Sequence, residues 1–261
     1  MQLRIYLLIF FSLLMFACDR KAPQPSGPLQ AELLPANASP AQVKVTDINA
    51  WVEQGRFFVT GVCSNESAAW QQIWLKVEPL DAAGNALQIK GAPAVIIATF
   101  SSGVPPKGRT SFFEGWPLAD FSGTPASCRI SGAGALQKPA GPVLLVEQVG
   151  GVKMMAPNAP GQPATEEIAW QIGGVLNNPM PMEAQHLRFE LMLYGTDNRL
   201  WFSMLLNPED PQFKQLIALE KPGPLAGGEK RQVGIYAYYE RLPQALKAQK
   251  IGRAELLAFD E

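Results

Sequence analysis

The sequence predicts an all-β protein with two tandem β-sandwich domains, and three observations support this prediction. Gly and Pro number 23 each among 261 residues, a composition typical of a chain with many turns. Short segments in which apolar and polar residues alternate recur along the chain, as expected for half-buried strands. A weak internal repeat relates residues 43–138 to residues 143–261, so we expect each copy to form one sandwich.

About six or seven segments in each copy have the length and alternation of strands. In the first copy they are 43–48, 57–65, 73–80, 95–100, 110–116 and 127–136, and in the second 143–149, 168–178, 187–193, 200–206, 232–239 and 251–259. Residues 243–250 are the only convincing helix, since Pro243 suits a first helical turn. A Pro-rich insertion at 154–167 distinguishes the second copy, and the sequence does not indicate its role.

Motifs at corresponding places in the two copies resemble a known type of envelope domain. A Gly-x-x-x-Asn strand end occurs at 61–65 and at 174–178, and a strand runs into Leu80-Asp81-Ala82-Ala83-Gly84 in one copy and Leu193-Tyr194-Gly195 in the other. A Pro-Gly-rich loop follows in each. This pattern resembles Ig-like sandwiches, and more narrowly the FxLYD type of bacterial envelope domain. The resemblance implies the fold and indicates no activity.

The first 18 residues have the layout of an export signal. Arg4 precedes an apolar stretch from Ile5 to Ala17, which at about 1.5 Å per residue covers about 20 Å, less than the roughly 30 Å that a spanning helix must cross. The ending Leu14-Met15-Phe16-Ala17-Cys18 resembles the lipobox of bacterial lipoproteins. We therefore expect residues 1–17 to be removed and acyl chains on Cys18 to anchor the protein in a membrane. The alternatives are an ordinary signal peptide with an incidental cysteine, or an uncleaved anchor.

Residues 18–42 have the composition of a flexible linker. They are rich in Pro, Ala, Gln and Ser, and so few apolar side chains cannot form a core. We expect this segment to tether the β domains to the membrane on the periplasmic side of the cell envelope. Asp19, directly after Cys18, resembles the inner-membrane retention signal of enteric bacteria, which favours the inner membrane.

Cys63 and Cys128 remain once Cys18 carries lipid. An isolated pair in an oxidising compartment predicts a disulfide, and Cys63, Trp74 and Cys128 resemble the immunoglobulin arrangement of a bridge packed on a tryptophan. Two free buried thiols or a metal pair are the alternatives. A metal is the poorer one, because no nearby His or further Cys completes a tetrahedral site.

Catalytic motifs are missing from the sequence, so we predict no enzyme, no cofactor and no metal. The single histidine, His186, has none of the companions of a catalytic triad and is interpreted as a polar residue at a strand edge. The acidic pairs Glu166-Glu167 and Glu209-Asp210 lie in Pro-rich loops, where solvated charges are more common than a paired-carboxylate or calcium site.

The preferred function is that of a non-enzymatic envelope lipoprotein acting as a protein-binding or scaffolding module. Lys plus Arg number 22 against 23 Asp plus Glu, so no strong field favours nucleic acid, and we expect a membrane contact through Cys18 and an envelope protein partner. Tyr236 and Tyr238 alternate onto one strand face and are the candidate partner contacts, although packing within the protein is the simpler explanation. Alternatives are an accessory factor for assembly of a secretion or pilus system, or an unrecognised periplasmic hydrolase or carbohydrate-active protein.

Overall fold

The computed structural model describes residues 38–39, 42–138, 141–154, 168–211, 213, 216–238 and 250–260. Within these residues the chain is all-β, with one short 3-10 helix, η4 (Leu118–Asp120), which confirms the predicted fold class. The strands are β1 (Val43–Glu53), β2 (Arg56–Asn65), β3 (Gln71–Leu80), β4 (Val95–Ala98), β5 (Arg109–Pro117), β6 (Ser127–Leu136), β7 (Leu145–Glu147), β8 (Lys153–Met154), β9 (Ile168–Asn177), β10 (Leu187–Gly195), β11 (Leu200–Leu206), β12 (Ile217–Leu219), β13 (Lys230–Tyr238) and β14 (Ile251–Asp260). None of the described segments is a helix long and apolar enough to cross a membrane.

The N-terminal half, residues 38–138, contains two three-stranded antiparallel sheets, β1-β2-β5 and β4-β3-β6. β1 and β2 are joined by a tight turn in which Gln54 and Gly55 both have positive φ, as a two-residue hairpin with right-handed twist requires. The sheets enclose a core to which alternate residues of each strand contribute, such as Phe57 and Val59 of β2 and Leu75 of β3. The two sheets are thus packed face to face, as in a β-sandwich.

The C-terminal half, residues 141–260, repeats this arrangement with other strands. One sheet has the order β11-β10-β14, and the other has the order β12-β13-β9-β7 with β8 also paired to β9. Their core is a separate cluster that includes Trp170, Ile172, Phe189, Leu191 and Leu193. By sheet order and position, β3 in the first half therefore corresponds to β10 in the second.

One asparagine in each half makes the same kind of contacts. The Asn65 side-chain amide donates to the carbonyl oxygens of Ala69, Val104 and Pro105, at 2.8, 2.9 and 3.1 Å. The Asn178 amide donates to those of Met182, Leu225 and Ala226, at 2.8, 3.1 and 3.2 Å. Both asparagines are fully buried, and each ties the end of one strand to the Pro-Gly-rich loop that precedes β5 or β13.

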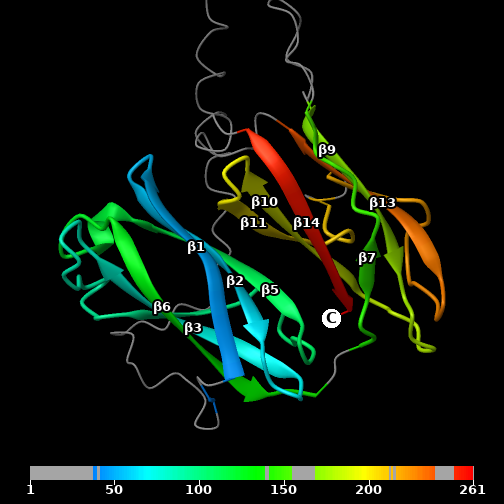
Figure 1. Cartoon of the computed structure of the whole chain (residues 1–261), viewed down its shortest axis with the longest axis horizontal. Helices are drawn as coiled ribbons and strands as arrows, with labels where there is room; N and C mark the ends of the chain where they lie inside the picture. The colour runs from blue at the N-terminus through cyan, green and yellow to red at the C-terminus, as the bar shows by residue number, and fades with distance from the viewer. Residues whose placement is uncertain are drawn as a thin grey trace, which may run out of the picture.

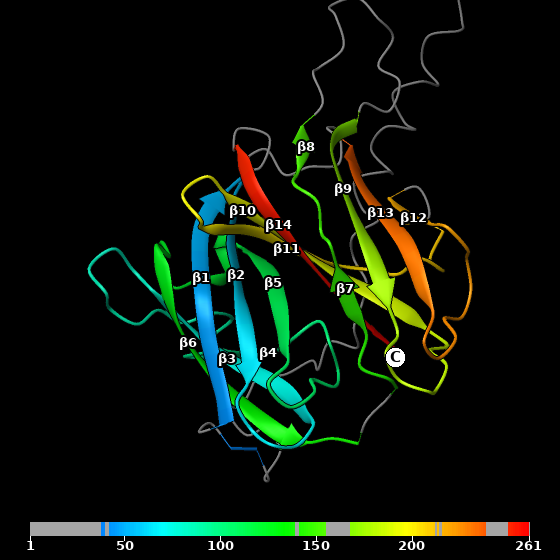
Figure 2. The same cartoon turned by 45° about the vertical axis from the view of Figure 1, so that its right-hand side comes forward.

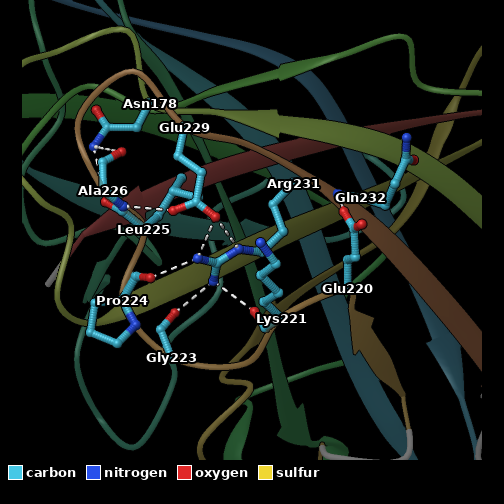
Figure 3. Close-up of polar contacts among 10 residues, drawn as sticks. All are labelled: Asn178, Glu220, Lys221, Gly223, Pro224, Leu225, Ala226, Glu229, Arg231 and Gln232. Carbon is cyan, nitrogen blue, oxygen red and sulfur yellow. Dashed lines mark hydrogen bonds and ion pairs between the residues drawn. The ribbon is translucent and has the colours of Figure 1, made fainter.

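In the second half this loop is also held by Arg231, as Figure 3 shows. The guanidinium, whose side chain is 4% exposed, donates to the carbonyl oxygens of Lys221, Gly223 and Pro224 at 2.6, 2.8 and 2.7 Å. Its remaining donors bind Glu229, at 2.8 and 3.1 Å. All five N–H donors of the arginine are therefore used, and three backbone carbonyls of the loop are fixed by a single side chain.

The two halves pack through sheets that do not correspond to each other in the two sandwiches. Figures 1 and 2 both show β1, β2 and β5 lying against β10, β11 and β14, and β11 contacts all three strands of the N-terminal sheet. The other two sheets lie on the outside. As a result β10 is covered on both faces, and every residue of it except Arg188 is buried.

Most predicted strands are present, with bounds that differ by one or two residues. In the first half, the strand predicted at 43–48 is longer and continues to Glu53 as β1. In the second half, the strand predicted at 143–149 is shortened to β7, and β8 and β12 were not predicted. Most of the predicted helix 243–250 and of the insertion 154–167 lies outside the described residues, as do Cys18 and Asp19. The division into two domains stays a prediction, which the two separate cores favour.

The predicted disulfide is wrong, because Cys63 and Cys128 are both free thiols. Cys63 lies near the end of β2 that leads into β3, whereas Cys128 is paired with Pro79 at the far end of β3. About six residues of strand separate these levels, or about 20 Å, and a disulfide needs Cα atoms within about 7 Å. Trp74 also lies on the outer face of β3 and not in the core.

Candidate functional site at the junction of the two halves

The junction between the halves has a polar centre at Glu190 of β10, whose side chain is fully buried. One carboxylate oxygen accepts a hydrogen bond from the Thr110 hydroxyl at 2.6 Å. The other accepts from the Ser111 backbone N–H at 2.7 Å and from the Ser111 hydroxyl at 3.0 Å. A carboxylate is costly to bury without such donors, so these bonds favour one specific orientation of the halves.

Further polar contacts cross the junction beside this centre. The Thr60 and Ser203 hydroxyls lie 3.0 Å apart, and they lie 2.8 and 2.9 Å from the carbonyl oxygen of Phe112. On β1, the Asn49 side-chain amide donates to the carbonyl oxygen of Leu200 at 2.8 Å. The junction therefore connects all three strands of the N-terminal sheet to the C-terminal half by hydrogen bonds.

Aromatic side chains seal the same junction. Trp51 and Phe113 come from the N-terminal sheet, and Trp201 and Phe202 come from β11. The ring centroids of Trp51 and Trp201 are 6.1 Å apart, and those of Phe113 and Phe202 are 5.1 Å apart, both in edge-to-face geometry. Such contacts add to the area that is buried, so the halves are expected to move as one body.

A cleft opens at one end of the junction, next to the linker that joins the halves. Its volume is about 400 Å³, within the roughly 300–1,000 Å³ typical of ligand sites. Three segments form its walls: the loop 101–109 with Trp70 beside it, the linker residues 142–147, and residues 256–260 of β14. Both views show this C-terminal end of β14 beside β7 (Figures 1 and 2).

One wall of the cleft is an open strand edge. β14 is the outermost strand of its sheet, and in the described part of the chain it pairs with β10 alone. Alternate N–H and C=O groups of an outermost antiparallel strand point away from the sheet, where another extended segment can bind them. Leu145, on the opposite wall, is 44% exposed although it is a large apolar residue. The cleft can therefore offer main-chain hydrogen bonds and an apolar contact together.

The charged residues around the cleft already have partners. Arg109 pairs with Glu255 at 3.1 Å, and Glu147 accepts hydrogen bonds from Lys230 at 2.7 Å and Asn177 at 2.8 Å. The bond from Lys230, followed by that from Asn177, lowers the pKa of Glu147 below its usual value. The surface left for a ligand is consequently apolar and main-chain in character, which suits a peptide better than a charged small molecule.

The residues singled out from the sequence do not come together at this cleft. Tyr236 lies half-buried on β13, with its backbone N–H donating to the carbonyl oxygen of Leu216 at 2.8 Å, and the side chain of Tyr238 lies outside the described residues. His186 lies directly before β10 with a 60% exposed side chain, 3.8 Å from Glu209. The described residues contain no cluster of three or more His, Cys, Asp or Glu side chains that could hold a metal ion.

The sequence contains one signal for the junction, which alternation of apolar and polar residues does not reveal. Residues 191–194 of β10, Leu-Met-Leu-Tyr, are apolar at four consecutive positions, which is typical of a strand covered on both faces. Met192 and Tyr194 indeed pack against Val62 of the N-terminal half. Nothing in the sequence pairs Glu190 with Thr110 and Ser111, because they lie about 80 positions away.

Neither a family model nor a curated protein matches this chain. Three solved structures resemble it at low TM-score. Red sea bream transglutaminase is 14% identical over 83% of this chain and 27% of that one, with a TM-score of 0.18. A calcium-binding mutant of Bacteroides uniformis β-glucuronidase 2 is 13% identical over 74% and 23%, with a TM-score of 0.18. The tandem CBM22-1-CBM22-2 domain of Paenibacillus barcinonensis Xyn10C is 10% identical over 86% and 85%, with a TM-score of 0.17. The chain thus spans about a quarter of the length of the first two.

Proposed function

We propose that this protein is a non-enzymatic lipoprotein of the bacterial cell envelope that binds a partner protein in the junction cleft. The signal-like residues 1–17 and the lipobox-like ending at Cys18 support the anchor, and Asp19 favours the inner membrane. The β body then faces the periplasm at the end of its linker. Acyl chains on Cys18 hold it at the membrane surface.

The observation that carries the binding role is the open edge of β14 inside an apolar cleft of about 400 Å³. A partner segment in extended conformation would add to this edge as a further strand, with its side chains contacting Leu145 and the loop 101–109. Main-chain hydrogen bonds then supply affinity and the apolar walls supply selectivity. This mode of binding also fits the second candidate, an accessory factor for a secretion or pilus system, because such assemblies present extended segments.

Fractionation of cells that express the full chain tests the anchor. The protein is expected in the membrane fraction with fatty acids on its N-terminal cysteine by mass spectrometry. The Cys18→Ser variant is expected to lose the acyl mass and to remain unprocessed at residue 17. A wild-type protein with its leader intact and Cys18 unmodified would refute the proposal.

Photo-crosslinking in intact cells tests the binding site. A photoreactive amino acid at Leu145, in the cleft, is expected to capture a discrete envelope protein. The same amino acid at Val52 is the matched control, because Val52 is 45% exposed against 44% for Leu145 and lies at the β1–β2 hairpin, outside the cleft. Equal capture from both positions would show that the cleft is not the binding site.

A further inference from the structure

The chain before β1 enters the fold in a direction that leads to the junction cleft. Ser39 forms an antiparallel bridge with Gly134 of β6, in which the Ser39 N–H donates at 2.8 Å and the Gly134 N–H donates at 3.2 Å. In an antiparallel pair, the step from Ser39 back to Ala38 runs the way β6 continues, towards residue 136. That continuation leads to Pro142, the first linker residue that lines the cleft. Ala38 and the cleft therefore lie towards the same end of β6.

The tether is long enough to reach the cleft. Eight residues separate Gly134 from Pro142, so these two positions are at most about 29 Å apart. Leu29 precedes Ser39 by ten residues, which can span about 35 Å when extended. The extended reach of the tether back to Leu29 thus exceeds the largest possible separation between Gly134 and Pro142.

The chemistry of this part of the tether matches the cleft. Between Cys18 and Val43 the only large apolar residues are Leu29, Leu33 and Leu34, and Pro28 and Pro35 flank them. Leu29 and Leu33 are four residues apart, a spacing that places them on one face of either a strand or a helix. The cleft presents the exposed Leu145 and the open edge of β14. The leucines of the tether can therefore supply an apolar contact to the exposed side chain of Leu145.

We propose that residues Leu29–Leu34 dock in the junction cleft of their own chain. The inference rests on the proposed function, because it names a competitor for the partner in the same cleft. A segment on a short linker has an effective concentration of about 1 mM, so an intrinsic Kd near 0.1 mM gives about tenfold more docked than free cleft. A partner must displace this segment, and displacement lengthens the free tether between the membrane and the β body.

Cross-linking in the full chain tests the docking. In a Cys63→Ala, Cys128→Ala background that keeps Cys18, Leu33→Cys is combined with Leu145→Cys or, as the matched control, with Val52→Cys. A short bismaleimide is expected to join positions 33 and 145 within one chain at about tenfold higher yield than positions 33 and 52, as the docked fraction requires. Equal yields from the two pairs would overturn the inference.

A second measurement does not depend on a cross-link and changes only the tether. In the same background, Leu29→Ser, Leu33→Ser and Leu34→Ser together are expected to raise the rate at which maleimide modifies Leu145→Cys about tenfold, with no change at Val52→Cys. An unchanged rate at position 145 would refute docking. Capture of the envelope partner from position 145 is measured separately. If the partner is captured but the tether does not dock, this inference alone is rejected. If the tether docks but no partner is captured, the proposed function alone is rejected.

Discussion

Strands β3 and β10 occupy corresponding places in the two halves. The face of each strand that points away from the core of its own half, however, meets different surroundings. In β3, the residues between the core positions stay partly exposed, and Glu78 pairs with Lys76 at 2.9 Å and Arg129 at 3.8 Å. In β10 the second face is covered by the N-terminal half, and Glu190 is held by Thr110 and Ser111. The difference teaches that the outer face of such a strand can carry a glutamate in either setting, provided that the hydrogen-bonding partners of the glutamate change with its burial.

Removing the two glutamates is expected to give the largest contrast. Glu190→Ala leaves the Ser111 N–H and two hydroxyls without their acceptor inside the junction, which should cost about 3 kcal/mol of the free energy of unfolding. Glu78→Ala removes a partly exposed pair and should cost less than about 1 kcal/mol. Urea unfolding of both variants measures this, and equal losses would show that the junction is not the tightly packed contact described.

Where the halves are alike, the effects should be alike. Asn65→Ala and Asn178→Ala each remove an amide that donates to three carbonyl oxygens, so each should lower the free energy of unfolding by about 2 kcal/mol. Gln88→Ala, at an exposed position, is the control and should change it by less than about 0.5 kcal/mol. A large loss in only one of the two halves would argue against their equivalence.

A smaller effect concerns the turn after β3. The side-chain amide of Asn85, followed by its backbone N–H, lowers the pKa of Asp81 below its ordinary value. A carboxyl whose pKa is lower in the folded protein stabilises the fold above the unfolded-state pKa, about 3.9, and loses that contribution as the pH falls through the folded value. The gap in urea midpoint between wild type and Asp81→Asn should therefore shrink from pH 5 to pH 2. A gap that stays constant over this range would contradict the assignment.

For the cysteines, we expect that reduction has no effect on the stability of the fold. Reductant should leave the unfolding midpoint unchanged, whereas a bridge between Cys63 and Cys128 would contribute about 4 kcal/mol and be lost on reduction. Burial raises the pKa of both thiols, that of Cys128 to about 12, so alkylation should be slow in the folded protein and complete after unfolding. Mass spectrometry of protein alkylated without reductant counts the thiols, and two unmodified cysteines after unfolding would restore the disulfide.

The sequence predicted the strands better than it predicted their contacts. Alternation over 73–80 and 187–193 located β3 and β10, because the core face of a strand is determined by its own side chains. Which outer faces meet depends on residues distant in the sequence, such as Glu190 and Ser111, and no local pattern encodes that. The disulfide prediction failed for the same reason, since spacing along the chain does not show that Cys63 and Cys128 lie at opposite ends of β3.

Contact between unlike sheets also determines how far such a structure can extend. Repeats that meet head to tail could in principle be added one after another without limit, since each new unit would present again the surface that the last one used. In the first half, however, the surface equivalent to the covered face of β10 carries Lys76, Glu78 and Arg129, with Arg129 69% exposed. Covering these charges would remove their hydration, so they act as a cap at the N-terminal end of the stack.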